Sequence, residues 1–279
     1  MKQFLKDYGV LILSIYGIVQ YWIITAWIKL VHKGVVKIYE AGTIEIGYAR
    51  NYGAIIGLNG TLRTLNKDIF VNEIYLRIIR LKDKAEHNFQ WYAFRSPEIN
   101  TVGTTPQAME LPAGFLISTK IPQRFNILFY DTKLAEEIKP LLTKHLSEWF
   151  KYVNKINNIK SSFPPNINNQ EIIQIQQNNI IEEFKKCPVY IDTYKELDRK
   201  CYWEAGKYEL EISVSTSKPD KVFTEKYEFE ITEEDAKNLK LNVITILEEP
   251  VRIYTGRVLY YYYNAQAHYS KFPMPKKSK

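Results

Sequence analysis

The stretch Tyr202–Val214, with the sequence YWEAGKYELEISV, carries the clearest structural signal in the chain. Gly206 predicts a turn, and from Lys207 to Val214 polar and apolar side chains alternate strictly. Successive side chains of a β-strand point to opposite faces, so this period of two predicts a strand with one buried face.

Aromatic residues, a glycine turn and an alternating strand, in that order, resemble the middle of immunoglobulin-like β-sandwich modules. The resemblance covers little more than the quoted stretch, so it implies an architecture and no function. Val222–Ile231 alternates in the same way, and we also predict strands at residues 189–191, 241–246 and 251–263. Thr232 is expected to cap a short helix between these strands. Residues 187–265 are therefore predicted to form one antiparallel β-sandwich module.

Residues 35–131 repeat this pattern upstream, with short alternating segments separated by turn residues such as Asn66–Asp68. We predict a second β-sandwich module here, because short strands at regular spacing are typical of sandwiches.

Residues 132–186 change to a helical period of three to four and are predicted to form a connector between the modules. Pro140 is expected to end one helix and begin another. His145 lies on the apolar stripe and is interpreted as a core histidine. Residues 154–179 are rich in Asn and Gln and are interpreted as containing the linker.

The N-terminal region holds 21 uncharged residues, Tyr8–Ile28. As a helix this run would span about 32 Å, close to the hydrocarbon thickness of a bilayer. Residues 1–34 are therefore predicted to be a single-pass transmembrane anchor with its flanks, located in the cell membrane. Slightly more Lys residues follow the run than precede it, which favours a cytoplasmic position for the rest of the chain.

The net charge of +7 comes from the two ends of the chain, because residues 35–270 carry equal numbers of basic and acidic residues. This balance gives no support for a nucleic-acid partner. Residues 266–279 are predicted to be a basic flexible tail. Cys187 and Cys201 are too few for a disulfide framework, and both a disulfide and free thiols remain open, with free thiols favoured.

Motifs for chemistry are absent from the sequence. The four His residues are scattered, no phosphate-binding loop or nucleophile elbow is present, and no metal, cofactor or catalytic residue is predicted. Two candidate surfaces remain. A binding surface is predicted where tyrosines of a last strand lie beside arginines, at Tyr261, Tyr263, Arg252 and Arg257. A helix–helix contact in the membrane is predicted at Ser14, Gly17 and Gln20.

We therefore expect a mainly β protein with one N-terminal transmembrane helix and two immunoglobulin-like sandwich modules joined by a helical connector. Its expected function is non-enzymatic binding or sensing of a protein or small ligand, with the lipid bilayer as a further partner. One alternative is a membrane effector that self-associates through its transmembrane helix. A second is a membrane-tethered enzyme whose site is not visible in the sequence.

Overall fold

The computed structural model describes residues 14–27, 34–95, 109–162, 169–217, 219–256 and 262–271. The strands are β1 (Val35–Ala49), β2 (Gly53–Leu65), β3 (Ile69–Arg80), β4 (Glu86–Arg95), β5 (Met109–Glu110), β6 (Phe115–Ile117), β7 (Gln123–Tyr130), β8 (Gly206–Ser217), β9 (Asp220–Ile231) and β10 (Ala265–Lys271). The helices with labels are α2 (Thr132–Ser162), α3 (Asn169–Lys185), α4 (Pro188–Lys200) and α5 (Glu233–Tyr254).

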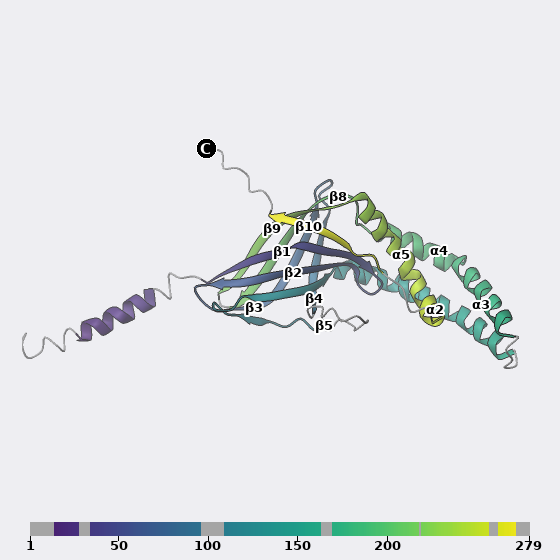
Figure 1. The fold of residues 1–279 in the computed structure, drawn as a ribbon, viewed down its shortest axis with the longest axis horizontal. Helices are drawn as coiled ribbons and strands as arrows, with labels where there is room; N and C mark the ends of the chain where they lie inside the picture. Colours follow the sequence, from purple (N-terminus) through teal and green to yellow (C-terminus); the bar gives the residue numbers. More distant parts are fainter. Residues whose placement is uncertain are drawn as a thin grey trace, which may run out of the picture.

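Eight of the described strands close into an antiparallel barrel (Figure 1). The order around the wall is β4-β7-β2-β1-β10-β9-β8-β3, and β4 also pairs with β3, which closes the ring. The short strands β5 and β6 extend this sheet beside β4 and β3. Closure leaves these eight strands with neighbours on both sides, which removes the exposed edges of an open sheet.

The two predicted sandwich modules are wrong, because the two strand-rich regions share this one sheet. β8 pairs with β3 along most of its length, from Tyr208↔Arg80 to Thr216↔Val71. β10 pairs with β1, as in Ala265↔Ile46. The strands after residue 200 therefore fill the gap between β3 and β1 instead of forming a second module.

The barrel interior is filled by apolar side chains from every wall strand, among them Ile46, Ile56, Phe129 and Leu210. Trp203 closes this core at the end next to the helices. Its indole Nε1 donates to the carbonyl of Gly47 at 3.0 Å, and its ring lies near those of Phe89 and Tyr208. One side chain thus contacts β1, β4 and β8.

Helices α2 to α5 form a helical arm that extends from this end of the barrel (Figure 1). The arm has a second apolar core of its own, built around Trp149, Ile156, Phe184 and Val251. His145 is fully buried on α2, which confirms its interpretation as a core histidine. Both thiols, Cys187 and Cys201, are free and buried.

Three further predictions about helices need correction. Residues 189–191 were expected in a strand but lie in α4, which starts at Pro188 with the Cys187 Sγ as its cap. Thr232 caps α5 as predicted, yet α5 runs to Tyr254, so residues 241–246 and 251–254 are helical where strands were expected, while residues 257–261 lie outside the described part. Pro140 lies inside α2, which continues without a break.

The N-terminal run is helical over residues 14–27, while residues 8–13 and 28 lie outside the described part. Within the described ranges, none of the helices combines the length and the apolar character needed to cross a membrane. This finding contradicts the predicted single-pass anchor and, with it, the predicted cell-membrane location.

Candidate functional site

A hollow of about 470 Å³, here called the mouth cleft, lies where the barrel meets the helical arm. Its walls come from the start of β4, the start of α2 and the end of α4. The lining residues are Glu86, His87, Asn88, Asp131, Thr132, Lys133, Leu134, Glu137, Arg199, Lys200 and Tyr202. A cleft of this size suits a small organic molecule.

Asp131 is the central acid of the mouth cleft and sits between β7 and α2. Its Oδ1 accepts from the Leu134 backbone N–H at 3.0 Å, so it caps α2, and its Oδ2 accepts from the Tyr202 hydroxyl at 2.9 Å. Burial opposes ionisation, but the His87 imidazole, the Leu134 amide and the Tyr202 hydroxyl outweigh it and lower the pKa of Asp131. Asp131 is therefore an ionised acceptor at neutral pH.

An aromatic stack forms one wall of the mouth cleft. The rings of His87 and Tyr202 lie 3.5 Å apart and almost parallel, at 14°. His87 Nδ1 lies 3.8 Å from Asp131 Oδ2, which is ion-pair distance for a protonated imidazole but too long for a hydrogen bond. Burial, with the charge of Asp131 added to it, raises the pKa of Tyr202 well above its usual value, so Tyr202 remains a donor.

Several of the side chains that line the mouth cleft are charged. Lys200 Nζ on α4 bonds Glu137 Oε2 on α2 at 2.5 Å, which ties the two helices together. Arg199 directs its Nη2 to Glu196 at 2.6 Å. Lys133 lies one helical turn before Glu137 and forms no ion pair with any residue that the structure describes.

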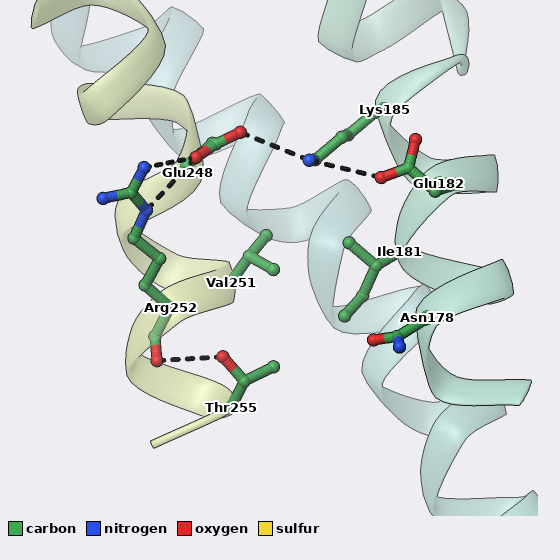
Figure 2. A pocket seen from close by; sticks show the side chains of 8 residues that line it. All are labelled: Asn178, Ile181, Glu182, Lys185, Glu248, Val251, Arg252 and Thr255. Carbon is green, nitrogen blue, oxygen red and sulfur yellow. Dashed lines mark hydrogen bonds and ion pairs between the residues drawn. The ribbon is translucent and has the colours of Figure 1, made fainter. Parts of the chain in front are cut away.

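A second hollow of about 400 Å³, the α3–α5 pocket, lies within the helical arm (Figure 2). Figure 2 shows Glu248 of α5 between Arg252 of the same helix and Lys185 of α3. Arg252 donates to Glu248 Oε2 from Nη2 at 2.6 Å and from Nε at 3.1 Å. Lys185 lies 3.2 Å from Glu248 Oε1 and 3.3 Å from Glu182.

The charges of the α3–α5 pocket satisfy one another. Burial opposes the ionisation of Glu248, but the Arg252 hydrogen bond and the charge of Lys185 lower its pKa. Each of the four charged side chains that line the pocket has an opposite partner within it. The network braces α5 against α3, and this pocket presents no unpaired charge to a ligand.

The structure does not bring together the predicted tyrosine–arginine surface. Arg252 lines the α3–α5 pocket near the end of α5, whereas the Tyr263 hydroxyl donates to Asp235 at the start of that helix. Seventeen helical residues separate these ends, about 25 Å. Arg257 and Tyr261 lie outside the described residues.

The predicted helix contact residues lie on the helix of residues 14–27. The Gln20 amide donates to the Tyr16 hydroxyl at 3.1 Å within that helix. A Cβ added at Gly17 would meet no atom within 4 Å. Ser14 is the first described residue of the helix. The prediction of a helix–helix contact through these residues stays untested.

Sequence reasoning missed the mouth cleft. One signal was available, since Asp131 directly precedes a helical pattern, as capping residues do. Arg199 and Lys200 lay in a segment whose helix was not recognised, and no pattern places His87 beside Tyr202. Among the described residues, no group of three His, Cys, Asp or Glu side chains is arranged to hold a metal ion.

Comparisons with protein-family models, curated proteins and solved structures gave no significant match for this chain.

Proposed function

We propose that the protein is a non-enzymatic binding protein that holds a small polar ligand in the mouth cleft. The single observation that carries this proposal is the cleft itself, which residues of three elements line together with the stacked His87 and Tyr202 rings and several charged side chains. A concave site with a few convergent polar groups is the usual form of a ligand site.

The chemistry of the cleft supports binding over catalysis. Asp131 is occupied as a helix cap and as the acceptor of Tyr202, and its lowered pKa keeps it ionised. Tyr202 keeps its proton, because its pKa is raised. Neither group has a pKa near neutrality, where acid–base catalysis is most effective.

A second candidate function is proton transfer by His87, favoured by its approach to Asp131. A carboxylate beside one ring nitrogen orients a histidine whose other nitrogen acts as a base. This candidate uses the same cleft, because the substrate must reach the imidazole. Chemical conversion of a bound ligand would distinguish it from non-enzymatic binding.

The test is a titration of the full chain, followed by backbone amide NMR, with four probes: phosphate, putrescine, glycine and glucose. Binding in the cleft is expected to shift the amides of residues 86–88, 131–134 and 199–202. A cleft-filling variant, Asn88→Trp, should abolish these shifts, whereas Gln90→Trp, also exposed and two residues further along β4, should preserve them. Shifts confined to residues 178–185 and 248–255 would move the site to the α3–α5 pocket and overturn the proposal, as would the absence of any shift.

A further inference from the structure

The acidic side chains of the mouth cleft are already engaged. Both oxygens of Asp131 accept hydrogen bonds from the protein itself. Glu137 bonds Lys200, and Glu86 lies 3.3 Å from Arg77, outside the cleft. A cationic ligand would therefore have to displace an existing partner from each carboxylate.

The cations of the cleft are less fully engaged. Lys200 is neutralised by Glu137, but Lys133 has no ion pair among the described residues. Arg199 contacts Glu196, which is not part of the cleft lining, and its side chain is 70% exposed. That bond uses only Nη2, so the described residues leave the other N–H groups of the guanidinium for a ligand.

Lys133 and Arg199 lie on different helices, α2 and α4. Glu137 lies four residues after Lys133 on α2, and Lys200 directly follows Arg199 on α4. The Lys200–Glu137 bond of 2.5 Å fixes the two helices at this point. Lys133 and Arg199 thus line the same cleft as the stacked rings of His87 and Tyr202.

From this arrangement we infer that the ligand of the mouth cleft carries an oxyanion, either a carboxylate or a phosphate, bound by Lys133 and Arg199. The inference rests on the proposed function and adds the ligand class to it. A guanidinium matches the two oxygens of such a group, and an ammonium adds a strong point charge. Charge-assisted hydrogen bonds to both cations supply the selectivity for anions.

The test is isothermal titration calorimetry of the full chain in a non-phosphate buffer of physiological ionic strength, about 0.15 M, with inorganic phosphate, glutarate and putrescine as probes. We expect phosphate or glutarate to bind, and putrescine not to bind. Lys133→Gln and Arg199→Gln should each weaken anion binding about tenfold or more. Lys139→Gln removes the same charge from an exposed site on α2 outside the cleft and should change the affinity less than twofold, by the screening of surface charges.

Two results overturn the inference while the proposed function stands. In the first, putrescine or an uncharged probe shifts the cleft amides while the anions do not. In the second, the anions bind, but Lys133→Gln, Arg199→Gln and Lys139→Gln all reduce the affinity for them equally. If no probe binds up to about 10 mM in calorimetry and no cleft amide shifts, the proposed function fails together with the inference.

Discussion

The barrel and the helical arm bury their side chains in different ways. The barrel core is enclosed by a closed ring of paired strands, and the indole of its closing residue, Trp203, makes a hydrogen bond to Gly47. The arm core is smaller, and beside its Phe184 lies the ring of His145, whose two nitrogens are buried without a hydrogen-bond partner among the described residues. The comparison suggests that the barrel is the more stable unit and that the arm opens first.

The largest expected effect comes from removing the residue that closes the barrel. Trp203→Ala should lower the free energy of unfolding by about 4 kcal/mol, because it creates a large cavity and removes the Gly47 bond. Urea unfolding followed by circular dichroism measures this change.

Trp149→Ala is the matched variant in the arm, since Trp149 is also almost fully buried. Hydrogen exchange should then accelerate in α2 and α3 while the barrel strands remain protected. Equal acceleration in β1, β2 and β8 would show that the two cores unfold as one unit.

The next largest effect is the loss of stability at low pH that comes from His145, the buried histidine of the arm. Burial, together with the positive charge of Arg50, lowers the pKa of His145 to about 4. In the unfolded chain this imidazole takes up a proton near pH 6.5, whereas in the folded protein it stays neutral until about pH 4. The contribution of neutral His145 to the free energy of unfolding is therefore fully present above pH 6.5 and is lost as the pH falls from 6.5 to 4. The loss from this group reaches about 3 kcal/mol.

Variants isolate this contribution from that of the carboxylates. His145→Leu should remove this part of the pH dependence and should be at least as stable as the parent at pH 7, because it buries no unpaired nitrogen. His268→Leu, at an exposed position of β10, should retain the parent's dependence. Unfolding midpoints in urea, measured at pH 7 and pH 4.5, give the loss of stability between these two pH values for each variant. If His145→Leu loses as much stability as the parent, His145 is not the source of this part of the pH dependence.

The junction between the two regions gives a smaller effect. Asp131→Ala removes the cap of α2 and the acceptor of the Tyr202 hydroxyl, for an expected loss of about 2 kcal/mol. Asp131→Asn can still cap the helix and should recover most of this stability. Thermal unfolding of the two variants tests whether capping or charge dominates, and equal losses would favour charge.

The sequence predicted strands better than it predicted their partners. Alternation in Val222–Ile231 was sufficient to find β9, because period two is a local property. The pairing of β8 with β3 joins residues more than 100 positions apart, as in Arg77↔Glu211, and no local pattern specifies it. The fold class was therefore wrong although most strands up to β9 were correct.

The helical errors have a local cause. Residues 241–246 contain four β-branched residues in a short apolar run, a composition that suits strands as well as buried helices. The Thr232 cap was recognised, yet the length of α5 was not, since residues 241–246 and 251–263 were assigned to strands. The mouth cleft depends on these same elements, because Arg199 and Lys200 enter it only when residues 188–200 are helical.

The smallest expected effect tests the ion network of the arm. Glu248→Gln leaves Arg252 and Lys185 without their shared carboxylate, although Glu182 still neutralises Lys185. Both cations are about one-third exposed, so water stabilises them after the change, and the loss should stay below about 1 kcal/mol. Salt should weaken the parent slightly more than the variant, because it screens only an intact pair. Urea unfolding at low and high salt measures both quantities. A loss of several kcal/mol would mean that the network is effectively buried and that the arm depends on charge as the barrel depends on Trp203.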